Sequence, residues 1–232
     1  MKFLTVILSL TAGSVDAISF LGLGGLFNAH ITGNLMILAS RIVGNGPAPI
    51  AIILSVPIFM IALFLTRLLV RRLELLGHDS LQPLILIQLL LLLGFFVICV
   101  ADGQHVNPNA AFAILGGMLG VSAMAVQNAL VQGSLAGTPA TTAMTANITR
   151  FTLDLVDALF GRDADTITTA RRRSKATWPP IAGFAIGCGI GAACEAAFAM
   201  RALAFPVSLA LLALVIGPAA KREFKNSIAL RR

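Results

Sequence analysis

Residues 3–40 read FLTVILSLTAGSVDAISFLGLGGLFNAHITGNLMILAS, an apolar run whose only titratable side chains are Asp16 and His30. A straight helix needs only about 20 residues to cross the hydrocarbon core of a bilayer, and this run is nearly twice as long. We therefore predict one crossing together with a tilted extension, a re-entrant segment or a broken helix. Its start loosely resembles a signal peptide, but the apolar character continues past Asp16, so we interpret it as a retained membrane helix.

The composition of the whole chain is typical of a membrane protein. Hydrophobic residues make up 57% and charged residues 12%, with a mean hydropathy of +0.91. This leaves too little polar surface to cover a soluble fold of 232 residues. The net charge of +7 comes from Lys and Arg between and after apolar segments, which argues against nucleic-acid binding. We predict an all-α polytopic bundle in a lipid bilayer, forming a single membrane domain over residues 1–232.

The sequence contains no motif for a cofactor, a metal or catalysis. Cys99, Cys188 and Cys194 lie in apolar stretches and form no CxxC pair, so neither a disulfide framework nor a zinc site is predicted. Phosphate-binding loops, catalytic triads and nucleotide fingerprints are absent as well. A membrane-embedded enzyme would need a converging nucleophile, base and oxyanion donors, and none is indicated. We therefore predict no enzyme activity and no cofactor.

Charge-poor windows predict six crossings. A cytoplasmic N-terminus places almost all Lys and Arg residues on the cytoplasmic side, including those near Arg67 and those in Arg171–Lys175, while Arg41 and Arg201 fall opposite. This predicts a multi-span membrane protein with both termini in the cytoplasm. The alternative of eight crossings moves the cluster at Arg67 outside. The six windows are residues 3–40, 47–66, 81–101, 103–149, 176–200 and 202–220.

A short polar pattern occurs once in each half of the chain. DA at residues 16–17 precedes HITGN at 30–34, and NA at 128–129 precedes AMTAN at 143–147. The separation from Asp16 to Asn34 is 18 residues and that from Asn128 to Asn147 is 19, so the alignment needs one insertion. Each half then holds three crossings, and the odd number predicts an inverted-topology repeat. The predicted repeats are residues 3–101 and 110–220, followed by a basic cytoplasmic tail, residues 221–232.

The combined motifs are similar to those of a known family. AGSVDA at residues 12–17, LFNAHITGN at 26–34, VQNA at 126–129 and MTAN at 144–147 resemble the YoaK-like bacterial membrane proteins, domain-of-unknown-function family 1275. The resemblance covers essentially the whole chain. It implies a multi-span protein of the cytoplasmic membrane and no established activity. The second half departs from the pattern at Ala146, where Gly is usual, and His30 has no counterpart because Ala143 stands there.

Asp16 is the first candidate for a functional site. An ionised carboxylate inside a membrane segment costs about 3 kcal/mol on insertion scales, so such residues commonly mark ion or proton pathways. Asn128 is its neutral match in the second half, so only one half would titrate. On a straight helix Asp16 and His30 would lie about 21 Å apart, and they could form a proton-relay pair only if the segment folds back. The alternative for Asp16 is a hydrogen-bonded packing residue. Gln127, next to Asn128, belongs to the same candidate substrate-binding set.

Thr32, Gly33 and Asn34, with Thr145 and Asn147 in the second half, complete that set. Thr is a common N-cap, and a small residue permits close approach or an unusual backbone angle, so each pattern predicts the start of a half-helix. The free N–H groups at such a start attract an anionic ligand group. The alternative is that these side chains only form hydrogen bonds between helices.

Glycines recur every four residues in two of the later spans. Gly183, Gly187 and Gly191 form one stripe, and Gly116 and Gly120 form another. Small residues at this spacing let helices approach closely. We predict that the stripes serve packing within the bundle, and a homo-oligomer is the alternative.

Two functions fit these features. The first is a secondary transporter or facilitator for a small polar or anionic metabolite, with its site between the two half-helix starts and Asp16 coupling transport to a proton or cation. The second is a non-transporting scaffold or sensor that acts through its basic cytoplasmic loop and tail.

Overall fold

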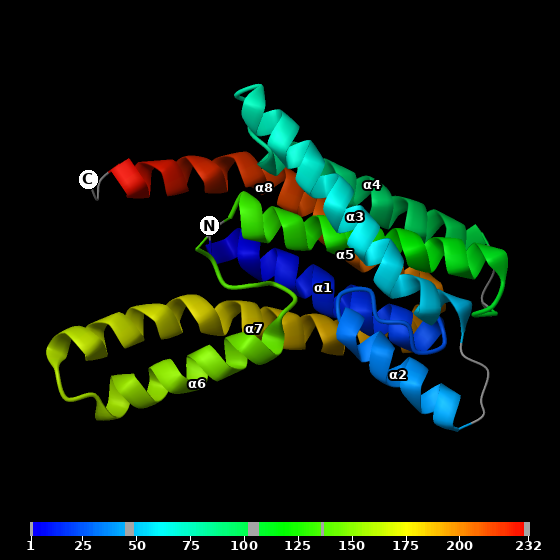
Figure 1. Cartoon of the computed structure of the whole chain (residues 1–232), viewed down its shortest axis with the longest axis horizontal. Coiled ribbons are helices and arrows are strands. Elements are labelled where there is room, and N and C mark those ends of the chain that lie inside the picture. The colour runs from blue at the N-terminus through cyan, green and yellow to red at the C-terminus, as the bar shows by residue number, and fades with distance from the viewer. Residues whose placement is uncertain (1, 45–48, 102–106, 136, 230–232) are drawn as a thin grey trace.

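The structure is a computed structural model that describes residues 2–44, 49–101, 107–135 and 137–229. All regular structure in these ranges is helical, which confirms the predicted all-α class (Figure 1). The helices are α1 (Lys2–Gly22), α2 (Ile31–Val43), α3 (Ile50–Leu75), α4 (Leu81–Ala101), α5 (Ala111–Gly133), α6 (Met144–Phe160), α7 (Ala164–Phe198), the 3-10 turn η1 (Ala199–Leu203) and α8 (Ala204–Ala229).

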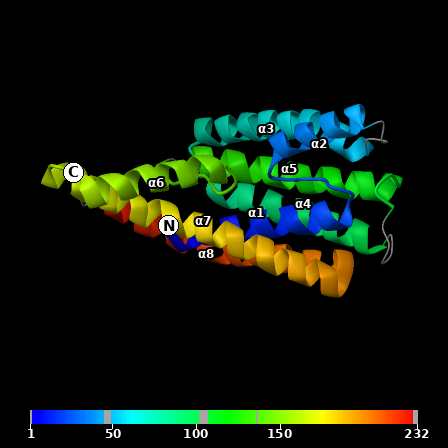
Figure 2. The ribbon, with the colours of Figure 1, turned by 90° about the horizontal axis from the view of Figure 1, so that it is seen from below.

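The long helices pack side by side in three layers. Figure 2 shows α2 and α3 along one side, α7 and α8 along the other, and α1, α4 and α5 between them. α1 packs most extensively on α7, and α5 packs on both α3 and α4. Two groups of buried apolar side chains fill the bundle, one around Phe95 and the other around Leu4 and Leu8.

Two helices are too short to cross a bilayer. α2 has 13 residues and α6 has 17, so their lengths are about 20 and 26 Å, against a hydrocarbon core of about 30 Å. Each follows a loop that turns back from the end of a long helix. In Figure 1 both begin near the middle of the bundle and run toward opposite ends.

Glycines with a left-handed backbone turn the first loop. Gly24 and Gly25 have φ angles of +68° and +95°, which side chains with a Cβ rarely adopt. The N–H of Gly25 donates to the carbonyl of Phe20 over 2.9 Å and ends α1. Gly137, with φ +89°, lies in the second loop. The extra length of the apolar run is therefore a complete helix followed by a returning loop and a short helix.

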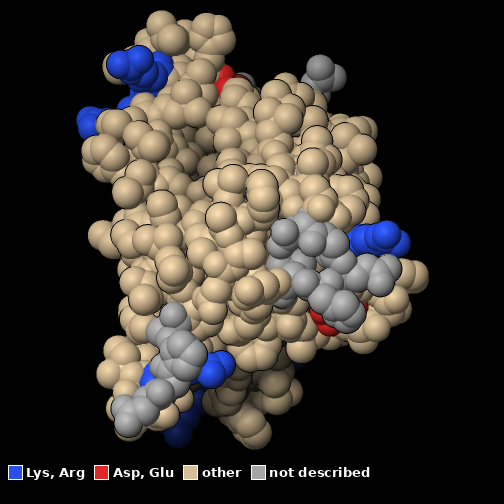
Figure 3. Space-filling model, turned by 90° about the vertical axis from the view of Figure 1, so that its right-hand side faces the viewer, with Lys and Arg blue, Asp and Glu red and all other residues tan. Residues whose placement is uncertain are grey.

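The surface of the bundle is that of a membrane-spanning protein. Within the described ranges, five helical stretches are long and apolar enough to cross a membrane: residues 3–22, 50–75, 81–101, 111–133 and 164–219. The last stretch contains α7 and α8, and the chain turns between them at Ala199, whose φ is +51°. Met60 and Phe64 on α3 are each 64% exposed. Figure 3 looks along the helices onto one end of the bundle, where few charged side chains show. Apolar surface of this extent is stable against lipid rather than water.

Parts of the predicted windows and tail fall outside the structure. Residues 47–48 and 103–106 of the predicted windows, and residues 230–232 of the predicted tail, lie outside the described residues.

The α7 glycine stripe faces α1, as predicted for packing within the bundle. A Cβ added to Gly187 would lie 2.9 Å from the Cα of Leu10, and one added to Gly191 would lie 2.8 Å from the Cα of Ser14. Distances below 3.0 Å do not occur between such atoms, so a side chain would push the backbones apart. The stripe therefore sets the distance between α1 and α7.

We predict that Gly187→Ala destabilises the protein by about 1–3 kcal/mol, because the new methyl group overlaps the α1 backbone. Gly189→Ala is the matched control, since nothing lies within 4 Å of a Cβ at that position. Chemical unfolding of the purified protein in detergent measures both changes. Equal stability of the two variants would contradict the close α1–α7 contact.

Candidate functional site

The buried carboxylate of Asp16 binds the loop that precedes α2. Its Oδ1 accepts the N–H groups of Asn28 (2.8 Å) and Ala29 (2.6 Å), and its Oδ2 accepts the N–H of His30 (3.2 Å). The same Oδ2 lies 3.1 Å from Nδ1 of the His30 ring. Asp16 is only 3% exposed, so these bonds replace its contacts with water. The segment folds back, and the two residues predicted to meet only in that case are in contact.

Asn34 holds the other side of this loop. Its Oδ1 accepts the N–H of Phe27 (2.9 Å), and its Nδ2 donates to the carbonyl of Phe27 (2.7 Å). The buried side chain of Asn34 thus forms hydrogen bonds with both backbone groups of Phe27, which lies outside any helix. Gly33 packs against the Phe27 ring, which a Cβ would approach to 2.9 Å. The predicted close approach at Gly33 is confirmed. The unusual backbone angle is wrong, because Gly33 lies in the first turn of α2 and has no positive φ.

The predicted N-caps are also wrong. α2 begins at Ile31 with His30 as its N-cap, and α6 begins at Met144 with Ala143 as its N-cap. The two N-caps have nearly equal angles, φ −89° and ψ 63° against φ −91° and ψ 66°, and neither makes a side-chain capping bond. Thr32 and Thr145 are each the second residue of a helix. Each loop is instead held by one side chain of the preceding helix, Asp16 or Asn128, and by one of the following helix, Asn34 or Asn147.

The loop before α6 is held by bonds of the same sequence spacing. Oδ1 of Asn128 accepts the hydroxyl of Thr142 over 2.6 Å, and these residues are 14 apart, as are Asp16 and His30. Nδ2 of Asn147 donates to the carbonyl of Ala140 over 2.6 Å, and these are seven apart, as are Asn34 and Phe27. In each half, therefore, one contact joins the loop to the preceding helix, and a second contact, of equal sequence spacing, joins it to the following helix.

A cavity of about 540 Å³ lies between the two helix starts, and we name it the central cavity. Its walls come from the ends of both loops, the first turns of α2 and α6, and one residue each from α3 and α5. A volume of this size suits a small organic ligand. The lining residues are Ala29, His30, Ile31, Thr32, Phe59, Asn128, Thr142, Ala143, Met144, Thr145 and Ala146.

The two helix starts in this cavity differ in charge. The first N–H groups of a helix lack partners within it, and the helix dipole makes that end positive. Near the start of α2, the Asp16 carboxylate already supplies a negative group. Near the start of α6, the matching side chain is the neutral Asn128. The start of α6 is therefore the one suited to an anionic ligand group.

His30 is the titratable side chain that faces the central cavity. Its side chain is 36% exposed, against 4% for that of Asp16. The ring packs beside the rings of Phe27 and Phe184, at centroid distances of 6.0 and 5.6 Å. Among the described residues, no group of three or more His, Cys, Asp or Glu side chains could hold a metal ion.

Four of the nine predicted site residues line the central cavity, and four more hold its loops in place. Those that line it are His30, Thr32, Asn128 and Thr145, and those that hold the loops are Asp16, Gly33, Asn34 and Asn147. Thr142 is not among the predicted residues, although Thr142 follows Asn128 by the same 14 residues by which His30 follows Asp16. Phe59 also lines the cavity and was not predicted, because it belongs to no polar sequence pattern.

Gln127, the ninth predicted residue, does not line the central cavity. It is fully buried, and its Nε2 donates to the carbonyl of Leu8 (2.9 Å) and to the hydroxyl of Thr141 (2.9 Å). Its Oε1 accepts Nε2 of Gln88 over 2.7 Å. Gln127 therefore ties the loop before α6 to α1 and α4 and acts on the site only through that loop.

The apolar helices and the two returning loops indicate a helical membrane protein, with an open cavity of mixed polar and apolar lining between the two short helices. Residues 4–216 match the profile of a family described as "Protein of unknown function (DUF1275)", and the chain belongs to that family. This match confirms the resemblance found in the motifs. No curated protein and no solved structure shows significant similarity to the chain.

We predict that Asn34→Ala destabilises the protein more than Asn147→Ala. The first change leaves two backbone groups of Phe27 unpaired and the second leaves one at Ala140, and each buried group costs about 1–3 kcal/mol. Chemical unfolding in detergent measures the difference. Asn109→Ala, at an exposed position, is the control and should change stability by less than about 0.5 kcal/mol. A larger loss for Asn147→Ala would contradict the described bonds.

Proposed function

We propose that the chain is a secondary transporter or facilitator for a small polar or anionic metabolite, and that the central cavity is its binding site. The observation that carries this proposal is the meeting of two helix starts, from different halves of the chain, at one cavity that has both polar and apolar lining residues. Broken helices that meet inside a membrane bundle are the usual ligand sites of secondary transporters. This is an analogy of architecture, and the chemistry of the lining residues must support it independently.

An inverted repeat is the arrangement that best accounts for the paired loops. α1 to α4 comprise a long helix, a returning loop, a short helix and two long helices, and α5 to α8 follow the same order. The N-cap angles and the spacings of the loop bonds agree between the halves. α2 and α6 run toward opposite ends of the bundle (Figure 1), as expected for halves related by an axis in the membrane plane.

We further propose six crossings of a bacterial inner membrane, made by α1, α3, α4, α5, α7 and α8, with both termini in the cytoplasm. Positive charge is concentrated at the end of α3 and the start of α7, and the positive-inside rule places these ends in the cytoplasm. The residues there are Arg67, Arg71, Arg72, Arg171, Arg172, Arg173 and Lys175. Arg41 lies near the end of α2, which leads to the start of α3, and Arg201 lies in η1, which follows the end of α7.

The chemistry of the central cavity favours a ligand with an anionic group. The start of α6 offers unpaired N–H groups and the hydroxyl of Thr145, and the neighbouring Asn128 adds no negative charge. The hydroxyl of Thr32 lies on the opposite wall. The Asp16–His30 pair is the titratable element of this cavity, so we assign the coupling proton or cation to it.

We predict that the full chain, reconstituted in liposomes, takes up at least one compound from a panel of small organic acids, amino acids and cations under an imposed pH gradient. Asp16→Asn should remove the dependence of uptake on the gradient, because the titratable pair is lost. Thr145→Val should lower uptake by several-fold to about tenfold, because one hydrogen bond to the ligand is removed while the side-chain shape is kept.

Thr152→Val is the matched control for Thr145→Val. Thr152 is exposed on the same helix and does not line the central cavity. Uptake by the Thr152→Val variant should therefore equal uptake by the wild type. The unfolding midpoint of each variant shows whether it is folded. No uptake of any compound by folded protein would overturn the transporter proposal and favour a scaffold or sensor that acts through the basic loop and tail.

A further inference from the structure

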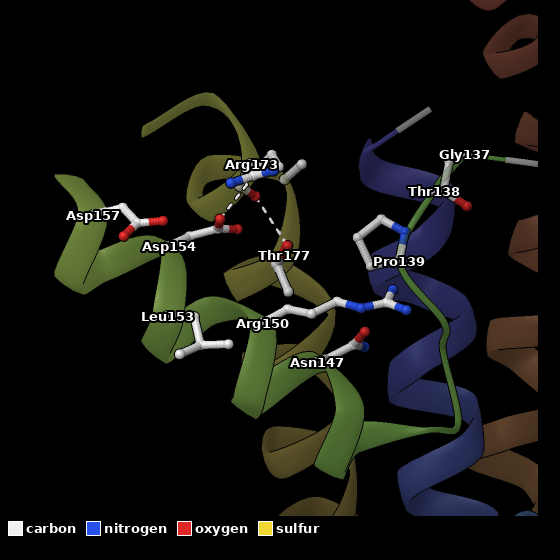
Figure 4. Close-up of a pocket in the computed structure, with 11 residues that line it drawn as sticks. Gly137, Thr138, Pro139, Asn147, Arg150, Leu153, Asp154, Asp157, Arg173 and Thr177 are labelled. Carbon is white, nitrogen blue, oxygen red and sulfur yellow. Dashed lines mark hydrogen bonds and ion pairs between the residues drawn. The ribbon is translucent and has the colours of Figure 1, made fainter. Parts of the chain in front are cut away.

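A second cavity, of about 710 Å³, lies between α6, α7 and the loop before α6, and we name it the α6–α7 cavity (Figure 4). It shares no residue with the central cavity. The two follow each other along α6, because residues 143–146 line the central cavity and Asn147 begins the lining of the other. The polar lining residues are Thr138, Asn147, Arg150, Asp154, Asp157, Arg173 and Thr177.

Asn147 presents an unpaired acceptor to this cavity. Its Nδ2 donates a hydrogen bond to the carbonyl of Ala140, but its Oδ1 is buried and has no hydrogen-bond partner. The residue is 0% exposed, and its amide lines the cavity. A buried amide oxygen without a partner is costly, so it calls for a ligand or water molecule that donates a hydrogen bond.

Arg150 provides a positive charge on the same wall. Asp154, the acidic residue one turn along α6, pairs instead with Arg173 of α7, whose Nε lies 2.8 Å from its Oδ1. Within the described ranges, Arg150 makes no ion pair. Figure 4 shows its side chain extending from α6 toward Pro139, above the amide of Asn147. A guanidinium group in this position suits a carboxylate, which it can bind through two parallel hydrogen bonds.

We propose that the α6–α7 cavity is a second binding site, for a small carboxylate that carries a hydroxyl or ammonium group on the adjacent carbon. Arg150 binds the carboxylate, and Oδ1 of Asn147 accepts a hydrogen bond from the hydroxyl or ammonium group. Leu153 and Ala176 provide apolar contact for the remainder of the ligand. The ion pair of Asp154 with Arg173 neutralises these two charges. Asp157, the remaining carboxylate of the lining, lies at the far end of the cavity from the Arg150 guanidinium (Figure 4). The exposed Arg150 is therefore the charge that selects the anion. Binding at this site does not require that the protein transports the ligand.

The test is isothermal titration calorimetry on the full chain in detergent, at constant ionic strength, with L-alanine, L-lactate and propionate as probes. The three share a carboxylate and a three-carbon skeleton, and only the first two carry a donor on the adjacent carbon. We expect L-alanine or L-lactate to bind at least several-fold more tightly than propionate, because only they satisfy Oδ1 of Asn147.

Arg150→Gln should weaken that binding roughly tenfold or more, and Arg150→Lys by less, because Lys keeps the charge without the paired donors. Arg172→Gln, at an exposed position on α7 outside the cavity, should bind like the wild type. Thr145→Val, in the central cavity, should do the same.

Three results would overturn the proposal. The first is that no probe binds to the folded protein. The second is that Arg150→Gln and Arg150→Lys bind like the wild type. The third is that Thr145→Val loses binding while Arg150→Gln keeps it, which would place the ligand in the central cavity and leave the proposed function standing.

Discussion

Three backbone N–H groups donate to one carboxylate, that of Asp16, and the position of the central cavity depends on this contact. The loop between α1 and α2 contains polar backbone groups that no helix satisfies, and a bilayer supplies no water for them. Asp16 satisfies three of these groups at once and thereby fixes where α2 begins. Without the carboxylate, the N–H groups of Asn28, Ala29 and His30 would lose this acceptor, and Asn34 would be left to hold the loop.

The two halves use different chemistry to reach the same geometry. Asp16 bonds to backbone N–H groups, whereas Asn128 bonds to the hydroxyl of Thr142. The second loop therefore needs no charge. This difference makes one wall of the central cavity titratable and leaves the other wall neutral, with a helix start open to a ligand. Under the proposed function, this asymmetry assigns a proton to one loop and an anionic ligand group to the other.

The parts of the structure that the sequence could predict were those set by composition and by paired motifs. Hydropathy predicted the helical class, and the overlong run at residues 3–40 predicted a returning segment. The match of Asp16 with Asn128 and of Asn34 with Asn147 identified the residues that hold both loops. The predicted N-caps were wrong, because His30 and Ala143, each two residues before the predicted threonine, take that position without a side-chain capping bond. The place of Gln127 could not be predicted, since its partners Leu8 and Gln88 are distant in sequence.

The contacts of Gln127 also bear on the order in which the protein assembles. The Asp16 carboxylate finds all its partners within the next 14 residues, so this contact can form before the rest of the chain is present. Gln127 bonds to Leu8, 119 residues earlier, and to Gln88, on the preceding helix. Its polar groups are therefore satisfied only when α5 reaches α1 and α4. α1 packs chiefly on α7 and α8, and α3 and α4 pack on α5. The bundle is therefore complete only when both halves of the chain have been synthesised and meet.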